Sequence, residues 1–400
     1  MFQISAERTF PHTEDFMEPS DLNSYLAGGV ARIVKDALRA VFDNPEESAF
    51  VAGFAAASRK AAALRQSHAS SGEHVPPFLI ASITDSCNLH CAGCYARENR
   101  ICTDGGPNGT GSCGTGNCGG GDRFGGKTPL TAETWERLFI EAESLGVGFI
   151  LLAGGEPLLR RDVLERAAGR PSVLFPVFTN GTLIDASYAA FFARNRNLVP
   201  VLSIEGGKET TDRRRGSGTY GALSAAMELL AAKKILFGAS VTVTAANMEE
   251  VTSAEFLERL QCNGCRLVVY VEYVPVSANT DNLALNGGQR AALERHVARL
   301  RAERAAMIFI SFPGDEHSSG GCLAAGRGFF HVNPYGGAEP CPFSPYSDTD
   351  VTETGIRGAL KSPLFTGLRE SGMLLEEHTG GCTLFRKREQ VRALADGGAR

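Results

Sequence analysis

Three cysteines within one short segment are the most reactive group of side chains in this chain of 400 residues. Cys87, Cys91 and Cys94 have the spacing C-x3-C-x2-C and directly follow an apolar stretch at residues 78–84. Three thiolates in one loop can bind three irons of a [4Fe–4S] cluster and leave the fourth iron open to a small molecule. A zinc site or three unrelated buried cysteines are the alternatives, although zinc usually takes four ligands.

A second motif follows the next apolar segment of the chain. Residues 148–153 lead into Gly154-Gly155-Glu156-Pro157. Glycines allow the backbone to approach a ligand closely, and the carboxylate of Glu156 can accept a charge-assisted hydrogen bond from an ammonium group. The same four residues would also make an ordinary turn, but their position one strand after the cysteines favours a functional role.

The elements that must position these motifs alternate between strands and helices. Near-continuous apolar runs indicate strands of a parallel sheet that is buried on both faces. The repeated alternation predicts an α/β fold, either a parallel (β/α) barrel or an open sheet, with the chemistry at the carboxyl ends of the strands. The expected strands are 78–84, 148–153, 173–178, 198–204, 235–243, 266–274 and 307–312, and the expected helices between them are 131–145, 160–168, 185–194, 219–233, 250–261 and 287–305.

Three further segments flank or interrupt the domain expected at 76–312. Residues 1–75 are expected to be a helical extension, and its alanine-rich helix at 46–66 is expected to pack on the main domain rather than on a partner or a membrane. Residues 102–126 are rich in glycine and contain three cysteines, and we expect a flexible insertion rather than a lid or a metal-binding loop. Residues 313–400 are expected to be a loop-rich extension.

Composition excludes several classes of protein. The net charge is −5 and no basic cluster is present, which argues against a nucleic-acid partner. Eleven cysteines without an export signal favour the reducing cytoplasm. No apolar run is long enough to predict a transmembrane segment.

The cysteine triplet and the Gly-Gly-Glu-Pro segment together resemble the signature motifs of the radical S-adenosylmethionine (radical SAM) enzymes. The resemblance implies a partial parallel (β/α)6 barrel, in which the open iron binds the amino and carboxylate groups of S-adenosylmethionine. Gly93 departs from the family pattern, because many members have an aromatic residue just before the third cysteine; here Tyr95 follows it. The cofactor contacts that the resemblance implies are Tyr95, Gly154, Gly155, Glu156, Pro157, Thr179, Asn180, Ser203 and Glu205, with strand end 271–275 flanking adenine.

The last section of the chain contains a second set of cysteines. Cys322, Gly336 and Cys341 resemble the opening of the auxiliary-cluster extension called SPASM, and Cys382 follows alone, as in the shortened form called Twitch. The resemblance implies one auxiliary [4Fe–4S] cluster on the three cysteines, with a fourth ligand that is absent, another cysteine or substrate. Between barrel and extension, Asp315, Glu316 and His317 are candidate acid–base residues or simply a solvated polar run.

The activity that the resemblance implies is reductive cleavage of S-adenosylmethionine to a 5′-deoxyadenosyl radical, which abstracts a hydrogen atom from substrate. A peptide or protein side chain is the leading substrate hypothesis. A small-molecule, lipid or cofactor precursor is the first alternative, and a non-catalytic iron–sulfur electron carrier or scaffold is the second. A low-potential electron donor such as ferredoxin or flavodoxin is the expected partner.

Overall fold

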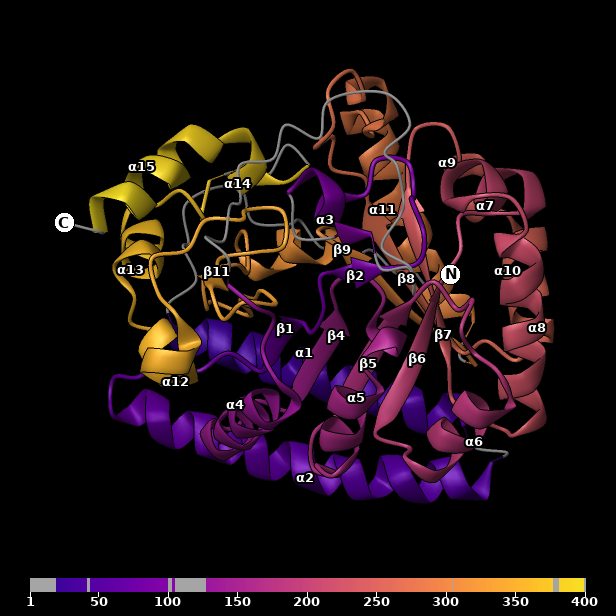
Figure 1. Cartoon of the computed structure of the whole chain (residues 1–400), viewed down its shortest axis with the longest axis horizontal. Helices are drawn as coiled ribbons and strands as arrows, with labels where there is room; N and C mark the ends of the chain where they lie inside the picture. Colours follow the sequence, from indigo (N-terminus) through magenta and orange to yellow (C-terminus); the bar gives the residue numbers. More distant parts are fainter. Residues whose placement is uncertain are drawn as a thin grey trace, which may run out of the picture.

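The computed structural model describes residues 19–41, 44–99, 103–104, 127–304, 306–376 and 381–398 (Figure 1). The insertion expected at 102–126, with its three cysteines, lies outside these residues, apart from the short strand β3 (Thr103–Asp104), which pairs in parallel with β2 (Ser86–Cys87). No helix among the described residues is long and apolar enough to cross a membrane.

A nine-stranded sheet forms the centre of the molecule, and seven of its strands are the seven predicted from the sequence. These seven run parallel in the order β1-β4-β5-β6-β7-β8-β9. The strand order ends at β9 on one side and at β11 on the other, so the described strands form an open, partial barrel. The bounds are β1 (Phe78–Ser82), β4 (Phe149–Ala153), β5 (Phe175–Thr179), β6 (Leu198–Ser203), β7 (Gly238–Val243), β8 (Leu267–Glu272) and β9 (Ile308–Phe312).

Helices make the six crossovers between these strands, and side-chain caps fix where several of them begin. Thr131, Asp185, Ser253 and Asn286 each accept a backbone N–H of the following turn, which satisfies a donor that the helix itself leaves free. The crossover helices are α4 (Ala132–Leu145), α5 (Arg161–Ala168), α6 (Ala186–Arg194), α7 (Lys208–Arg215), α8 (Thr219–Ala232), α9 (Met248–Val251), α10 (Ala254–Cys262) and α11 (Gly287–Glu303).

The two N-terminal helices close the end of the barrel where the strands begin. Val34 of α1 (Pro19–Ala40) and Phe54 of α2 (Pro45–Ser70) share one apolar cluster with Phe149, Leu267 and Ile308. The last three are the first residues of β4, β8 and β9, and Figure 1 shows both helices running beneath the strands. The expectation that this extension packs on the main domain is therefore confirmed.

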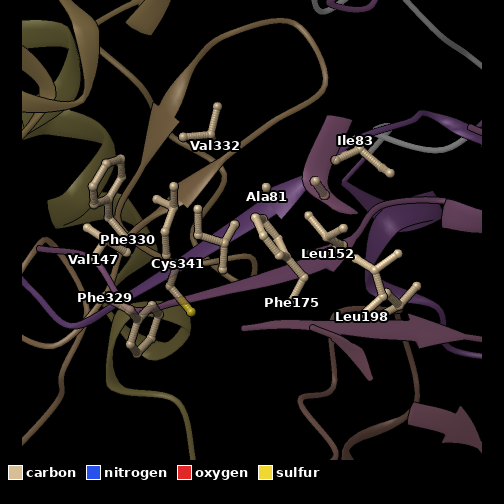
Figure 2. Packing of buried hydrophobic residues seen from close by; sticks show 14 of the residues in the cluster. Ala81, Ile83, Val147, Leu152, Phe175, Leu198, Phe329, Phe330, Val332 and Cys341 are labelled. Carbon is tan, nitrogen blue, oxygen red and sulfur yellow. The ribbon is translucent and has the colours of Figure 1, made fainter. Parts of the chain in front are cut away.

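The C-terminal section continues the sheet beyond β1. Strand β10 (His331–Val332) pairs in parallel with β1, and β11 (Ala338–Glu339) pairs antiparallel with β10. The buried imidazole of His331 lies between Glu339 (2.8 Å) and Ser82 of β1 (2.7 Å), which joins the extension to the barrel. Figure 2 shows Phe330 and Val332 packed in the same core as Ala81 and Leu152.

The extension is more helical than its sequence suggested. Residues 313–350 contain mainly loops, as expected, but four helices follow: α12 (Val351–Ala359), α13 (Pro363–Glu370), α14 (Thr383–Arg386) and α15 (Arg388–Gly398). Pro363 is the first residue of α13, a position that suits proline, and Ser362 before it is the N-cap.

Candidate active site

The three cysteines of the first motif lie on a loop at the carboxyl end of β1. Cys87 ends β2, and Cys94 caps α3 (Tyr95–Glu98). All three cysteines are partly buried. Burial raises the pKa of the Cys91 thiol, while the cation of Arg215 nearby opposes that increase. The loop therefore presents three thiols from one rim of the barrel, as the spacing predicted.

The Gly-Gly-Glu-Pro turn supports this loop directly. Gly155 N donates to Thr84 O (2.9 Å), and Glu156 N donates to Ser86 O (2.8 Å). A Cβ at Gly155 would overlap the Ser86 carbonyl, and Gly154 has a φ of 129° beside Thr84. The glycines are thus required for close approach to the cysteine loop, whereas the sequence suggested close approach to a ligand.

Glu156 is buried, and protein donors surround its carboxylate. Leu158 N (3.0 Å), Thr179 Oγ1 (2.7 Å) and Asn180 N (2.8 Å) all donate to it. Burial nevertheless raises the pKa of Glu156 to about 7. The carboxylate joins the ends of β4 and β5, and its predicted contact with the ammonium of methionine stays a prediction.

Asn180 extends this support to the cysteine loop from the other side. Its Nδ2 donates to Asn88 Oδ1 (2.8 Å), and Asn88 lies between the first two cysteines. Thr179 and Asn180 were predicted to contact the cofactor, but their side chains bond Glu156 and Asn88. In the structure both residues hold the rim in place.

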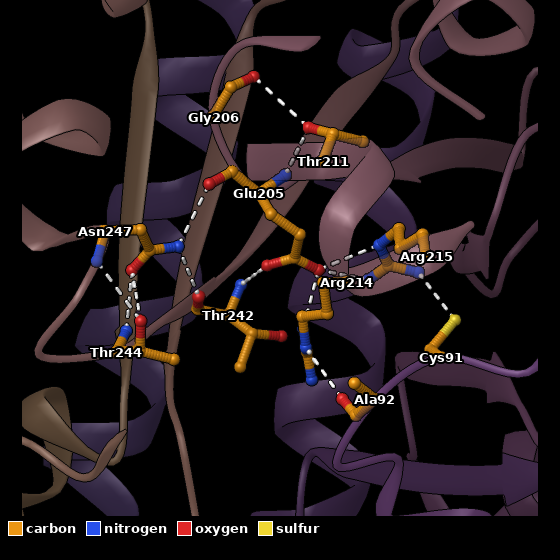
Figure 3. Close-up of polar contacts among 10 residues, drawn as sticks. All are labelled: Cys91, Ala92, Glu205, Gly206, Thr211, Arg214, Arg215, Thr242, Thr244 and Asn247. Carbon is orange, nitrogen blue, oxygen red and sulfur yellow. Dashed lines mark hydrogen bonds and ion pairs between the residues drawn. The ribbon is translucent and has the colours of Figure 1, made fainter. Parts of the chain in front are cut away.

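Glu205 lies at the centre of the most extensive polar network of the site (Figure 3). Its buried carboxylate accepts from Arg214 Nη1 (2.6 Å), Arg215 Nη2 (2.5 Å) and the backbone of Thr242 (3.1 Å). Both arginines come from the last turn of α7. Burial would lower the pKa of Arg215, but the charges of Glu205 and Cys91 raise it, so Arg215 is held as a cation.

The same two arginines reach the cysteine loop. Arg214 Nε donates to Ala92 O (3.2 Å), Ala92 N donates to Arg214 O (2.8 Å), and Arg215 Nη1 lies 3.9 Å from the sulfur of Cys91. The carboxylate of Glu205 is thus engaged by the arginines that hold the loop, and its predicted cofactor contact stays a prediction. The run Arg213–Arg215 after a strand end was the available sequence signal.

The sequence placed Tyr273 only within a strand end expected to flank adenine. In the structure Tyr273 lies directly against the cysteine loop. Its ring lies against Gly93, where a Cβ would come within 2.5 Å of the hydroxyl. The hydroxyl is buried without a hydrogen-bond partner among the described residues. Tyr273, the residue just after β8, thus occupies the space that a side chain at position 93 would need.

Two other predicted cofactor contacts lie on the same rim. Ser203 ends β6 and is half-buried. Tyr95 packs edge-on against Phe343, with 5.2 Å between the ring centroids. The cofactor contacts of both residues stay predictions.

The three cysteines of the C-terminal section converge on one small cavity. Cys322, Cys341 and Cys382 line it together with Glu316. Each sulfur accepts a backbone N–H from a residue just after it, namely Ala324, Phe343 and Phe385 respectively. N–H donors to sulfur are typical of iron–sulfur sites and tune their potential. The donor set therefore fits a cluster.

Glu316 and Asp315 have different surroundings although they are neighbours. Glu316 is 3% exposed, and burial raises its pKa to about 8. Asp315 instead pairs with Arg301 (2.7 Å) and accepts from Ser311 N (2.9 Å). Among the described residues Asp315 does not line the cavity, and its candidate acid–base role stays a prediction. The side chain of His317 lies outside the described residues.

The two cysteine sites are neighbours. Tyr95, which directly follows Cys94, contacts Phe343, and Asn99 Nδ2 donates to Pro342 O (3.0 Å). Among the described residues no three Cys, His, Asp or Glu side chains converge on a single metal position. Ligands of a cluster bind different irons and need not converge in that way.

The fold and the first cysteine site define a class of enzyme. Residues 81–261 match the family model of the Radical SAM superfamily, so this part of the chain is a radical SAM domain. This match confirms the resemblance drawn from Cys87 to Cys94 and from the Gly-Gly-Glu-Pro turn.

Individual relatives differ in their named activities. An AdoMet-dependent heme synthase of Methanosarcina barkeri is 26% identical over 76% of this chain and 87% of its own length. The mycofactocin maturase MftC of Mycobacterium ulcerans is 26% identical over 75% of this chain and 78% of its own. A Fe-coproporphyrin III synthase of M. barkeri is 27% identical over 44% of this chain, and that match spans only 39% of the relative's length.

Solved structures confirm the fold over most of the chain. SuiB of Streptococcus suis, in a crystal structure bound to the precursor peptide SuiA, superimposes with a TM-score of 0.60 at 18% identity. The superposition covers 86% of this chain and 79% of SuiB. At this identity the likeness concerns architecture alone.

Proposed function

We propose that this enzyme modifies a side chain of a peptide or protein and that it uses two [4Fe–4S] clusters. The observation that carries the proposal is the contact between the two cysteine sites, through Tyr95–Phe343 and Asn99–Pro342. The likeness to a named maturase, MftC, over three quarters of the chain supports the substrate class.

The residues of the first site fit S-adenosylmethionine bound to a three-thiolate cluster. Cys87, Cys91 and Cys94 would hold the cluster, and the buried hydroxyl of Tyr273 would donate to the cofactor. When bound, the reduced cluster and S-adenosylmethionine supply the carbon radical that removes a hydrogen atom from substrate.

The chain's own polar network prepares this site. Arg215 places a positive charge beside Cys91, which favours the thiolate that binds iron. Arg214 holds the loop backbone at Ala92, and Glu205 fixes both arginines. Rigid support of this kind orients ligands before the metal group binds.

The second site fits an auxiliary cluster on Cys322, Cys341 and Cys382. The three thiols are free, and each has a backbone donor in place. Thiols that serve clusters need a reducing compartment, so the proposal includes a cytoplasmic location. A low-potential donor such as ferredoxin or flavodoxin would supply the electrons.

A tetrapyrrole substrate is the second candidate. The observation that favours it is the pair of M. barkeri relatives, which are named as heme and Fe-coproporphyrin III synthases. It corresponds to the cofactor-precursor alternative.

One experiment separates the two substrate classes. The reconstituted enzyme would be incubated anaerobically with dithionite and S-adenosylmethionine, and either a degenerate synthetic peptide library or Fe-coproporphyrin III would be added. The proposal predicts more 5′-deoxyadenosine with the peptides, and peptides of altered mass. Stimulation by the tetrapyrrole alone would favour the second candidate, and nucleoside formation that neither substrate stimulates would contradict both.

A further inference from the structure

The cavity of the second cysteine site has three sulfur ligands and one carboxylate in its wall. Cys322, Cys341 and Cys382 contribute the thiols, and Glu316 contributes the carboxylate. The remaining lining residues are Val274, Phe312, Pro313, Phe343 and Thr383. Among the described residues, Glu316 is thus the one ionisable side chain that joins the cysteines in this wall.

Local structure directs the Glu316 side chain to this position. Residues Gly314–Ser319 form a short 3-10 helix after β9. The chain then turns back, since Gly321 N donates to Glu316 O (3.3 Å), and Ser319 Oγ donates to the carbonyls of Glu316 (2.7 Å) and Gly321 (2.9 Å). The turn brings Cys322 beside Glu316, and the thiol of Cys322 donates to the carboxylate.

The backbone also fixes the three cysteines around this carboxylate. Cys322 N donates to Leu374 O (2.8 Å), and a Cβ at Gly321 would overlap the same carbonyl. Cys382 is the N-cap of α14, and its sulfur accepts from Phe385 N (3.4 Å). A C-x2-C pair that began at Cys382 would have its second cysteine at position 385. Phe385 occupies that position, and the pair therefore does not exist.

We propose that Glu316 is the fourth ligand of the auxiliary cluster, through a carboxylate oxygen. The inference rests on the proposed auxiliary cluster and specifies how that cluster is completed. The buried carboxylate accepts from Leu323 N and from the Cys322 thiol. When the thiols bind iron and lose their protons, the Cys322 donor is lost, and iron bound by Cys322, Cys341 and Cys382 would take its place as a partner that offsets the cost of burial. The auxiliary cluster would then be closed, with no iron open to substrate.

The neighbouring charges suit this arrangement. Arg327 is buried beside the site, its Nη1 donates to Cys322 O (2.5 Å), and the charges of Cys322 and Glu316 act on it. One buried cation offsets part of the negative charge of three thiolates and a carboxylate.

A cyanide-binding experiment tests the ligand by spectroscopy. The background is the full chain with Cys87, Cys91 and Cys94 changed to Ala, so that only the auxiliary cluster forms. Four proteins are compared in this background. One retains Glu316, two carry Glu316→Ala or Glu316→Cys, and the control carries Asp315→Ala. Iron content, and the electron paramagnetic resonance spectrum of the reduced protein with and without cyanide, are measured together with thermal melting.

The expected result has three parts. The background and Asp315→Ala bind about four irons, and their spectra do not change with cyanide. Glu316→Ala either loses iron or gains a spectrum that cyanide shifts. Glu316→Cys restores about four irons and insensitivity to cyanide, which separates a ligand role from a structural one.

Three results would overturn the proposal. The first is a background protein whose spectrum already changes with cyanide, together with an identical response in Glu316→Ala. That result would mean that the auxiliary cluster has an open iron. The second is a cluster that becomes sensitive to cyanide when Cys102, Cys113 and Cys118 are changed, but not in Glu316→Ala. The fourth ligand would then come from the insertion. A background protein that melts normally but binds no iron would mean that the auxiliary cluster itself, and with it this part of the proposed function, is wrong.

Discussion

At the scale of single residues, the hydroxyl of Tyr273 is expected to connect the cysteine loop to cofactor binding. It is buried against Gly93 and has no partner among the described residues. A buried hydroxyl without a partner is costly, so the bound cofactor is expected to satisfy it.

Removal of this hydroxyl should therefore weaken binding of S-adenosylmethionine. We expect Tyr273→Phe to lower the affinity of the reconstituted enzyme by about threefold to tenfold, the equivalent of one neutral hydrogen bond, as measured by anaerobic calorimetry. Tyr270→Phe is the matched control, because the Tyr270 hydroxyl bonds Val251 O and serves the core. Equal affinities for Tyr273→Phe and the unaltered enzyme would show that the cofactor does not contact Tyr273.

Glu156 should give the cluster-free protein a distinct dependence on pH. Burial raises its pKa to about 7 from 4.5. The folded state then binds the proton more tightly than the unfolded state, so the stabilisation is full below pH 4.5 and is lost as the pH rises to about 7.

The size of this loss follows from the difference in pKa. The free energy of unfolding should fall by up to about 3 kcal/mol across that window. Glu156→Gln should remove this part of the slope, as measured by urea denaturation at a series of pH values. Identical slopes for the two proteins would mean that Glu156 titrates normally.

Glu205 should contribute strongly to stability because it neutralises two partly buried arginines. Its replacement by Gln leaves Arg214 and Arg215 without their carboxylate, and breaking a buried pair costs about 3–5 kcal/mol. Denaturation of the cluster-free protein would measure this loss. Glu46→Gln is a matched control, because Glu46 pairs with Arg196 but is 77% exposed, and it should cost less than about 1 kcal/mol.

At the scale of elements, the first cysteine loop depends on the turn after β4. We expect Gly155→Ala to displace this turn from Ser86, because the added Cβ would overlap the Ser86 carbonyl. Iron at the first site should then fall sharply, while iron at the C-terminal site is retained. The control is Gly221→Ala in α8, where a Cβ meets nothing within 4 Å. A full complement of iron in Gly155→Ala would show that the turn does not position the loop.

The sequence predicted these elements far better than their mutual contacts. The seven strands and the first cysteine site were recognisable because apolar runs and closely spaced cysteines are local patterns. The pairing of Glu205 with Arg214 and Arg215 could not be recognised in the sequence, because it depends on how α7 folds back over the rim. Asp315 and Glu316 could not be told apart for the same reason: only the turn of the 3-10 helix decides which one faces the cysteines.

At the scale of the whole molecule, one sheet connects all three sections of the chain. Helices α1 and α2 cover the end where the strands begin, and β10 joins the C-terminal extension to β1. The C-terminal cysteines therefore pack in the main core, as Cys341 does in Figure 2, whereas Cys87 and Cys94 pack in a small separate cluster around Ala96. The domain boundaries expected at 75/76 and 312/313 stay predictions.

The measurement that tests the account most directly is iron content combined with cleavage of S-adenosylmethionine. Three anaerobically reconstituted proteins are needed: the unaltered chain, one with Cys87, Cys91 and Cys94 changed to Ala, and one with Cys322, Cys341 and Cys382 changed to Ala. We predict about eight irons in the first and about four in each variant, with 5′-deoxyadenosine absent only when the first set is removed. About four irons in the unaltered chain and none in the first variant, or no nucleoside from the fully loaded chain, would contradict the account.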